Sequence, residues 1–452
     1  MPSITTYDQA YAAIWERSGW DRGFISNPFA GDEAARLGLV RTRRLLDELG
    51  APDRAFPIVH VAGSKGKGST CSFIDTILRA GGARTGRFLS PHLHSILERF
   101  VVDDRPIDEN SFTRVVDAVM HATEAVELAA PAVGTLTAWE LSTAIALLWF
   151  ERCACDIAVI EVGLGGTLDA TNVVTPAVSV ITRLDFEHTA ILGVTMAEIA
   201  ANKAGIIKTG RPVASVDQPA KGLDVIRARA RDVGATLLVA NHDWFVTGIT
   251  DSFDISGPGW GHADLRSSLR GHHQLENAGL AVVAVHLLAD SGEFPYPVPD
   301  EAIRAGLAST FVPGRYEVVR HRSGTTVVID GAHSPESMRA LAETIRVDFP
   351  DRKVVAVVAM LSDKDPAKVL PPIASVASRL IVSSASHPRA LPTDRLATAA
   401  GAIGGAFDTA PSIADAIDLA ASTPGMVRDN GVVVVTGSLV TAAEARVALG
   451  LA

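Results

Sequence analysis

The sequence predicts an α/β protein with two domains, each built on a mostly parallel sheet. Short apolar runs without polar alternation, such as 156–162 and 431–436, are typical of strands buried on both faces of a parallel sheet. Segments with helical periodicity separate these runs. The chain has 452 residues, which is more than one ordinary hydrophobic core accommodates, so its length also favours several domains.

The first domain is predicted to begin with helices. Leucines at three- and four-residue spacing before position 50 indicate helix, and Gly50 and Pro52 end it. A strand, a glycine-rich turn and an amphipathic helix at 71–80 follow. Buried strands of this domain are predicted at 57–62, 156–162 and 177–182.

A second block of the same kind begins late in the chain. Four strand candidates with helical segments between them lie at 325–330, 353–359, 379–383 and 431–436. The Pro- and Gly-bearing segment 295–314 is the expected join. We therefore predict domains at 1–298 and 299–452, with a ligand expected in a crevice between them.

Composition excludes several classes of protein. Forty-one Lys and Arg face 51 Asp and Glu, a formal charge of −10, which argues against nonspecific nucleic-acid binding. The three cysteines lack zinc-site spacing and are expected to be structural thiols of a reducing compartment. The longest apolar stretch, 144–150, is far shorter than the ~20 residues that cross a bilayer. With no signal peptide recognisable at the amino terminus, we expect a cytoplasmic protein that does not bind membranes.

The segment from Gly63 to Thr70 is the strongest local signal. Its glycines allow backbone N–H groups to turn toward a phosphate, Lys67 adds positive charge, and the following helix directs its N-terminus at the same point. The spacing departs from the strict P-loop, because Gly63 lies three residues before Gly66 rather than five. A glycine-rich turn without a ligand is the alternative, and the strand before it and helix after it disfavour that interpretation.

Polar groups at neighbouring strand ends indicate a metal beside this loop. Magnesium prefers hard oxygen ligands, and Glu161 ends an apolar strand just before the glycine-rich turn 163–166. His188 follows another buried strand across a short polar loop. A solvated carboxylate and a structural histidine are the alternatives. The carboxyl edge of a doubly wound sheet, however, is where such folds bind ligands.

A series of motifs, in order along most of the chain, resembles the folylpolyglutamate/dihydrofolate synthases of the Mur ligase superfamily. The motifs are 62–69, 89–93 with 98–99, 136–140, 161–172, 187–189, 202–208, 273–277, 313–315, 330–333 and 363–365. The resemblance implies a Mur-type P-loop ATPase domain with a smaller Rossmann-like domain behind it. It also implies a monomeric ligase that uses ATP and Mg²⁺ to join L-glutamate to a pterin or folate.

The resemblance carries site residues over position by position. Catalytic roles fall on Lys67, His188, Lys203 and His333, the last near the incoming glutamate. The expected ATP-binding residues are Gly63, Lys65, Gly66, Lys67, Gly68, Ser69, Thr70, Asn277, Arg315 and Asp330. The expected Mg²⁺ ligands are Ser69, Glu161 and His188. Substrate binding falls on Gly38, Leu39, Ser90, His92, Thr137, Glu140, Leu168, Asp169 and Ala170. Lys203 matches a lysine that the family carbamylates, which turns a cation into an anion able to bind a second Mg²⁺.

The chain departs from the family pattern at a few positions. Ser64-Lys65 replaces the usual Thr-Asn of the loop, and Trp139 is the aromatic residue of the Thr-x-Phe-Glu segment. The segment from Asp185 to His188 replaces Gly-x-Asp-His, and Ser334 replaces an Asn. These departures affect details of the pterin, metal and glutamate sites.

The expected activity is amide ligation through an acyl phosphate, with dihydrofolate synthase and folylpolyglutamate synthase activity in one enzyme as the default. Three alternatives remain. An ATP-binding switch would not need Ser69, Glu161 and His188 together. A dinucleotide-dependent dehydrogenase would carry Gly-x-Gly-x-x-Gly where this chain has 330–333. A Mur-type ligase acting on another acid is nearer, and the motifs at 89–93 and 161–172 favour folate over it.

Overall fold

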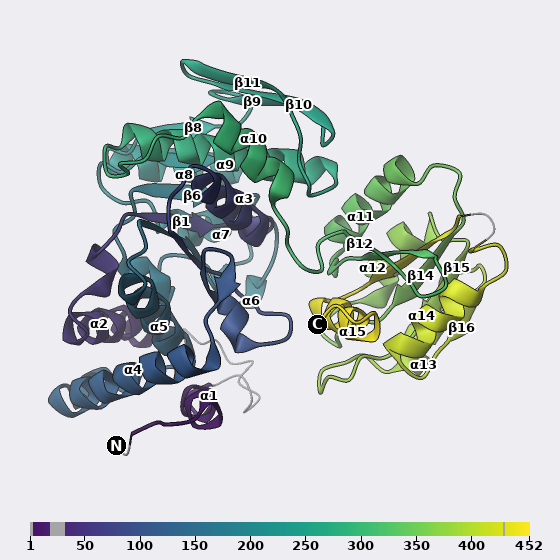
Figure 1. The fold of residues 1–452 in the computed structure, drawn as a ribbon, viewed down its shortest axis with the longest axis horizontal. Coiled ribbons are helices and arrows are strands. Elements are labelled where there is room, and N and C mark those ends of the chain that lie inside the picture. The colour runs from purple at the N-terminus through teal and green to yellow at the C-terminus, as the bar shows by residue number, and fades with distance from the viewer. Residues whose placement is uncertain (1–2, 19–31, 428–429) are drawn as a thin grey trace. The chain divides into compact units, whose positions relative to one another are not determined.

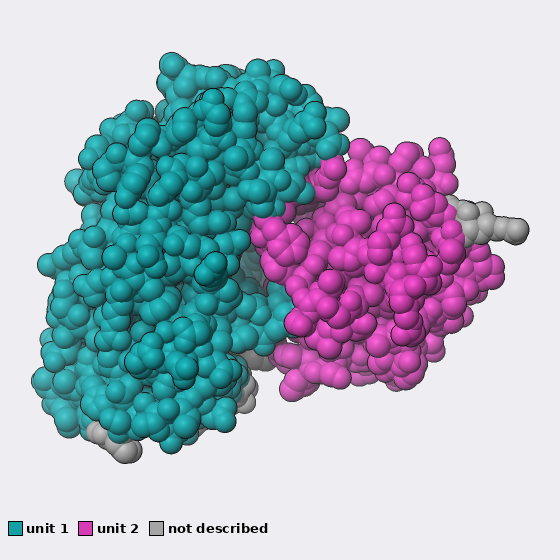
Figure 2. Space-filling view, viewed as in Figure 1, with its two compact units in different colours: residues 1–268, 274–310 teal, residues 269–273, 311–452 magenta. Residues whose placement is uncertain are grey.

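The computed structural model describes residues 3–18, 32–427 and 430–452 and divides the chain into two compact units (Figure 2). The first unit comprises residues 1–268 and 274–310, and the second comprises 269–273 and 311–452. The domain boundary predicted at 298/299 stays a prediction. The contacts place α10 (Asp300–Ser309) in the first unit, where it packs on α3 (Lys67–Ala80).

The first unit is built on an eight-stranded sheet in the order β4-β3-β2-β5-β1-β6-β7-β8, of which Figure 1 labels β1, β6 and β8. All pairs from β2 to β8 are parallel, and β3 and β4 add an antiparallel edge. The strands are β1 (Ile58–Ala62), β2 (Thr85–Phe88), β3 (Phe100–Val102), β4 (Arg105–Pro106), β5 (Ile157–Glu161), β6 (Val178–Ile181), β7 (Val213–Ser215) and β8 (Leu237–Val239). The predicted strands at 57–62, 156–162 and 177–182 are confirmed as β1, β5 and β6.

Helices pack around this sheet, and two cores hold them. One core joins Ile58 and Ile160 to α1, α2, α4 and α5, and the other joins Ala62 and Ile181 to α7 and α8. The helices are α1 (Tyr7–Trp15), α2 (Asp32–Glu48), α4 (Glu109–Ala129), α5 (Ala138–Arg152), α6 (Thr189–Leu192), α7 (Met196–Ala204), α8 (Ala220–Asp232) and α9 (His272–Asp290). Short 3₁₀ turns are η2 (Pro52–Arg54), η3 (Ile96–Arg99), η4 (Pro131–Val133) and η5 (Ala170–Val173).

The helical prediction for the amino-terminal region is confirmed in α1 and α2, and its part over 19–31 lies outside the described residues. A separate antiparallel sheet of β9 (Phe245–Ile249), β10 (Ser252–Gly257) and β11 (Trp260–Leu265) was not predicted. Within the described ranges, no helix combines the length and apolar character needed to cross a membrane.

The second unit has a six-stranded sheet in the order β12-β13-β17-β14-β15-β16, parallel except for β12. Successive residues face opposite sides: Val354 and Ala356 join a core with α11, α12 and α13, while Val355 and Val357 join a core with α14 and α15. Because both faces are covered, the strands read as unbroken apolar runs. The four predicted strands are confirmed as β13, β14, β15 and β17.

The strands of the second unit are β12 (Glu317–Arg320), β13 (Thr326–Ile329), β14 (Val354–Val358), β15 (Arg379–Val382), β16 (Phe407–Thr409) and β17 (Val432–Thr436). The helices are α11 (Pro335–Asp348), α12 (Pro366–Ala374), α13 (Thr393–Ile403), α14 (Ile413–Ser422) and α15 (Leu439–Ala448).

Candidate functional site

The glycine-rich loop connects β1, a central strand, to the N-terminus of α3. Gly63 and Gly66 both have positive φ, 156° and 88°, a conformation that favours glycine. A Cβ at Gly63 would lie 1.7 Å from the Thr182 hydroxyl oxygen, and one at Gly66 would lie 2.3 Å from Oδ1 of Asn277. The loop therefore requires glycine at both positions, for conformation and for space.

The backbone N–H groups that can face a phosphate lie at the end of the loop, not at Ser64 and Lys65. The amides of Ser64 and Lys65 donate to the carbonyl oxygen of Arg183, at 2.9 and 3.1 Å. The helix α3 begins at Lys67, and the first amides of a helix have no intrahelical acceptor. The amides from Lys67 to Ser69, in the first turn of α3, are therefore available to an anion, whereas the amide of Lys65 already has an acceptor.

Two amide side chains of α9 contact the start of α3. Gln274 Nε2 lies 3.4 Å from Ser69 Oγ, and Thr70 Oγ1 lies 3.4 Å from Asn277 Oδ1. Asn277 also donates to Gln274 Oε1 at 2.9 Å. Asn277, a predicted nucleotide residue, is thus brought to the loop, whereas sequence reasoning gave Gln274 no role.

Glu161 ends β5 beside the loop and is 5% exposed. Its carboxylate lies 3.7 Å from Lys67 Nζ and accepts a hydrogen bond from the backbone amide of Ser90 at 3.1 Å. The parallel pairing of β1 with β5 places this carboxylate here, because Val61 and Glu161 are register partners. Glu161, Lys67 and Ser90 were all predicted, and the structure brings them together.

The chemistry of the donors fits a magnesium ion. The hydroxyl of Ser69 and the carboxylate of Glu161 supply hard oxygens at a helix N-terminus, and Mg²⁺ typically takes one or two carboxylates plus substrate phosphates and water. His188 is exposed, with a left-handed backbone, at the start of α6. Across the described parts of the chain, no three His, Cys, Asp or Glu side chains form a metal-binding group.

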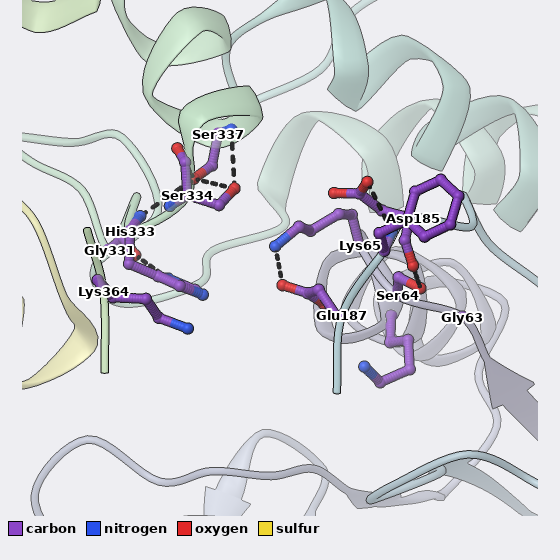
Figure 3. Close-up of polar contacts among 12 residues, drawn as sticks. Gly63, Ser64, Lys65, Asp185, Glu187, Gly331, His333, Ser334, Ser337 and Lys364 are labelled. Atoms are coloured by element: carbon purple, nitrogen blue, oxygen red, sulfur yellow. Dashed lines mark hydrogen bonds and ion pairs between the residues drawn. The ribbon is translucent and has the colours of Figure 1, made fainter. Parts of the chain in front are cut away.

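The segment that follows β6 lies along the loop. Ser64 Oγ donates to the carbonyl oxygen of Asp185 at 3.0 Å, and the ammonium of Lys65 forms an ion pair with Glu187. Figure 3 shows Lys65 and Glu187 pointing toward one another. The loop thus carries two lysines: Lys65 pairs with Glu187, which follows β6, and Lys67 lies near Glu161, the last residue of β5.

Lys203, on α7, is 4% exposed, and its Nζ donates to the carbonyl oxygen of Gly63 at 2.8 Å. Burial, together with the charge of Lys67, lowers the pKa of Lys203 to about 7, while Glu187 and Asp169 oppose this shift. An amine with this pKa is largely neutral just above neutral pH, so it is a nucleophile as well as a hydrogen-bond donor.

Gly38 and Glu140, predicted to bind substrate, lie together between α2 and α5. Thr137 caps α5 in a capping box with Glu140, whose carboxylate receives two bonds from Arg41 at 3.1 and 2.8 Å. A Cβ at Gly38 would lie 2.9 Å from Glu140 Oε1. Burial raises the pKa of Glu140, and Arg41 opposes that shift.

Asp169 is 2% exposed and organises the turn after β5. It accepts bonds from the amides of Leu164 and Thr171 and from the Trp139 indole, at 2.9, 3.0 and 3.1 Å. Burial raises the pKa of Asp169, and these bonds oppose the shift. Its carboxylate therefore shapes the turn, in which Leu168 is partly exposed and Ala170 is buried.

The remaining predicted substrate residues, Leu39 and His92, are partly exposed. His92 accepts a bond from Arg99 Nε at 2.9 Å, and burial with the charge of Arg99 lowers the pKa of His92 to about 4. The His92 ring is therefore neutral at physiological pH. Ser90, which begins this segment, precedes a cis proline, Pro91.

Three predicted residues lie in the second unit, around the carboxyl end of β13. Asp330 accepts bonds from the amides of Tyr316 and Ala332, both at 2.8 Å. His333 Nδ1 lies 2.8 Å from the carbonyl oxygen of Gly331 (Figure 3), and a Cβ at Gly331 would lie 3.3 Å from Nη1 of Arg315. Arg315, Asp330 and His333 thus form one group within this unit.

Sequence reasoning missed three residues that hold the site in place. Arg41 lies one helical turn after Gly38, so helical spacing alone places both on one face of α2. Gln274 lies three residues before Asn277 on α9, and the same rule applies. The role of Arg183 could be found only from the structure, because its backbone carbonyl oxygen, and not its side chain, accepts the hydrogen bonds from the loop.

The fold and the loop define a phosphate-binding α/β protein with a second α/β unit, the architecture of a Mur-type ligase. Residues 111–285 match the Mur ligase middle domain, and residues 314–439 match the Mur ligase glutamate ligase domain. A dihydrofolate synthase/folylpolyglutamate synthase from Mycobacterium tuberculosis is 35% identical, over 91% of this chain and 90% of that protein. The chain belongs to the dihydrofolate synthase/folylpolyglutamate synthase family of Mur ligases.

Solved structures agree with this membership. M. tuberculosis folylpolyglutamate synthase complexed with ADP superposes with a TM-score of 0.86 at 32% identity, covering 98% of each chain. E. coli FolC in complex with DHPP and ADP gives a TM-score of 0.84 at 28% identity, covering 100% of this chain and 99% of that chain. These likenesses confirm the predicted family and fold class.

Proposed function

We propose that this protein is an ATP- and Mg²⁺-dependent amide ligase that joins L-glutamate to the carboxylate of a pterin or folate, releasing ADP and phosphate. The observation that carries the proposal is the group formed by Lys67, the first-turn amides of α3 and the buried carboxylate of Glu161 at the end of the central strands. The relative's name and the DHPP- and ADP-bound structure support a pterin-type acid.

The reaction needs an activated carboxylate, because a free carboxylate would have to expel oxide to react with an amine. A carboxylate oxygen attacks the γ-phosphorus of ATP and ADP leaves, giving an acyl phosphate. The glutamate nitrogen then attacks the acyl carbon, loses a proton, and phosphate departs. Lys67 and the first-turn amides hold the transferring phosphoryl group, a reaction that depends on positioning and charge neutralisation.

Ser69, Glu161 and His188 are the residues that we assign to the metal. When bound, Mg²⁺ neutralises charge on the phosphate oxygens. The carboxylate of Glu161 is buried beside the start of α3, and Ser69 lies in the first turn of that helix.

The other assignments follow the resemblance and the contacts described above. We assign Asn277, Arg315 and Asp330 to the nucleotide, His333 to the incoming glutamate, and Lys203 to carbamylation. We assign the pterin to the surroundings of Gly38, Leu39, Ser90, His92, Thr137, Glu140, Leu168, Asp169 and Ala170. Both glutamate additions, to dihydropteroate and to reduced folates, fall within the proposed activity.

One assay tests the proposal. The purified protein, ATP, Mg²⁺ and glutamate are combined with dihydropteroate or tetrahydrofolate, offered separately, while ADP release is measured. We expect ADP release to depend on both the acid and glutamate, and Lys67→Ala to abolish it. Near-wild-type turnover in that variant contradicts the loop assignment. If the wild type releases no ADP with dihydropteroate and none with tetrahydrofolate, the folate assignment is contradicted.

A monomer in the cytoplasm is the setting that we propose for this activity. Cys71, Cys153 and Cys155 are free thiols, and burial raises the pKa of each, which suits a reducing compartment. Sedimentation analysis of the purified protein tests the oligomeric state directly.

A further inference from the structure

Two charged side chains beside the proposed nucleotide site contact each other. Lys65 of the loop and Glu187, just before His188, form an ion pair, although 122 positions separate them. Their side chains are 24% and 23% exposed, so the pair is only partly screened by water. Both residues follow neighbouring parallel strands, β1 and β6, of the first unit.

The backbone around this pair holds it against the phosphate loop. The amides of Ser64 and Lys65 donate to the Arg183 carbonyl, and the Ser64 hydroxyl donates to the Asp185 carbonyl. The segment 183–187 is thereby fixed along residues 63–65. From this backbone the Lys65 side chain reaches Glu187, as Figure 3 shows. Lys65 lies two residues before Lys67 in the loop.

Each lysine of the loop therefore has a carboxylate partner from the protein. Lys67 meets Glu161 at 3.7 Å and Lys65 meets Glu187. Glu187 also lies within electrostatic reach of Lys203, whose ammonium form it favours and whose Nζ bonds to the loop carbonyl of Gly63. Glu187 thus also favours the charged form of Lys203, beside the loop.

We propose that Glu187 competes with the nucleotide phosphates for Lys65, so that nucleotide binding exchanges one anionic partner of Lys65 for another. The inference rests on the proposed nucleotide site and adds to it a residue that weakens binding. Lysine suits the exchange, because its ammonium is a point charge on a flexible stem that can change partners while its base stays fixed. The measured affinity is then the difference between the lysine–phosphate and lysine–glutamate interactions.

Nucleotide titration of the full-length protein tests this exchange. The dissociation constants of Mg·ADP and Mg·AMPPCP are measured by calorimetry for the wild type, Lys65→Gln, Glu187→Gln and the double variant. We expect Lys65→Gln to weaken binding about tenfold, as the loss of one charge-assisted bond implies. We expect Glu187→Gln to tighten binding about two- to fivefold, the range for a partly exposed ion pair. In the Lys65→Gln background, Glu187→Gln should tighten binding less than it does in the wild type.

Glu276→Gln is the matched control. Glu276 is also 23% exposed and pairs with Arg183, so its replacement removes the same charge near the loop without touching Lys65. We expect its affinity to equal that of the wild type. Equal tightening by Glu276→Gln would attribute the effect to net charge and overturn the exchange, as would unchanged or weaker binding in Glu187→Gln.

The two levels of the proposal fail separately. Tryptophan fluorescence, which reports on the first unit, checks that each variant is folded. A folded wild type that does not bind nucleotide, or a Lys67→Ala variant that binds as tightly as the wild type, removes the proposed function itself. A wild type that binds nucleotide alongside an unresponsive Glu187→Gln removes only the exchange.

Discussion

Burial changes the proton affinity of two basic side chains in the first unit, and each change has a measurable consequence. Lys203 has a pKa lowered to about 7, and His60, fully buried in β1, has a pKa lowered to about 3. In both cases the low-dielectric surroundings disfavour the charged form. The first change bears on covalent chemistry and the second on stability.

We predict that Lys203 is carbamylated in bicarbonate-containing buffer. Its neutral amine attacks CO₂, a nitrogen–carbon bond forms, and the proton is released to solvent. Carbon-13 NMR with labelled bicarbonate should show a carbamate resonance that disappears in Lys203→Arg. Lys208, a second lysine with a lowered pKa, of about 8, provides the control, since Lys208→Arg should keep the resonance. A carbamate resonance that persists in Lys203→Arg would show that another amine is carbamylated and would contradict the prediction.

We predict that His60 makes the first unit less stable in acid. Between its ordinary pKa of 6.5 and its folded pKa of about 3, the unfolded chain binds the proton and the folded chain does not. Stability therefore falls as pH decreases through this window, by about 2 kcal/mol at pH 5 from this residue. Urea unfolding followed by tryptophan fluorescence at pH 8 and 5 should show that loss in the wild type and a smaller one in His60→Gln. Equal losses would contradict the prediction.

At the scale of elements, the position of the phosphate-loop helix depends on close packing with α10. A Cβ on Gly306 would lie 2.5 Å from the Cα of Ile77, a backbone atom of α3 that cannot move aside alone. Glycine therefore allows the two helices to approach at this point. The approach sets where the first turn of α3, and so its amides, can lie.

We predict that Gly306→Ala destabilises the first unit by about 1–3 kcal/mol through overpacking and weakens Mg·ADP binding. Gly401→Ala in α13 is the control, because its Cβ would meet Phe407 only at 3.6 Å or more, and it should not destabilise the protein. Chemical denaturation and calorimetry measure the two effects. Wild-type stability and affinity in Gly306→Ala would show that α3 can shift without consequence.

The strand, loop and helix around the site could be predicted because buried apolar runs and glycines leave few structural alternatives. The β9–β11 sheet could not, since β9 is mostly exposed and β10 buries only Phe253 and Ile255, so no unbroken apolar run marks it. The Lys65–Glu187 pair was also beyond sequence reasoning. It depends on β1 and β6 being neighbours, which is a property of strand order rather than of either segment.

At the scale of the whole molecule, the two units carry separate cores and different spectroscopic probes. All six tryptophans lie before residue 269, and none lies in 311–452. Tryptophan fluorescence therefore follows the first unit alone, whereas far-ultraviolet circular dichroism follows both. Two cores in one chain are also a usual cause of departure from two-state unfolding.

We predict that Mg·ADP raises the urea midpoint of the first unit, which fluorescence detects. The midpoint of the second unit, seen as a separate step by circular dichroism, should rise less. Ligand at a hundred times its dissociation constant adds about 2.7 kcal/mol to the unit that binds it. Urea titrations with and without nucleotide measure both transitions, and Lys67→Ala should abolish the shift. A single transition that moves equally by both probes would mean that the units unfold together.

The strand order of the second sheet has a consequence for how the protein is made. The last strand in the chain, β17, lies in the middle of the sheet, between β13 and β14. Until the ribosome has released residues 432–436, β13 and β14 lack the neighbour that joins them, and their valine-rich edges stay open to other chains. A chain truncated before residue 432 would therefore leave β12–β13 and β14–β16 as two separate sheets rather than as a shortened domain.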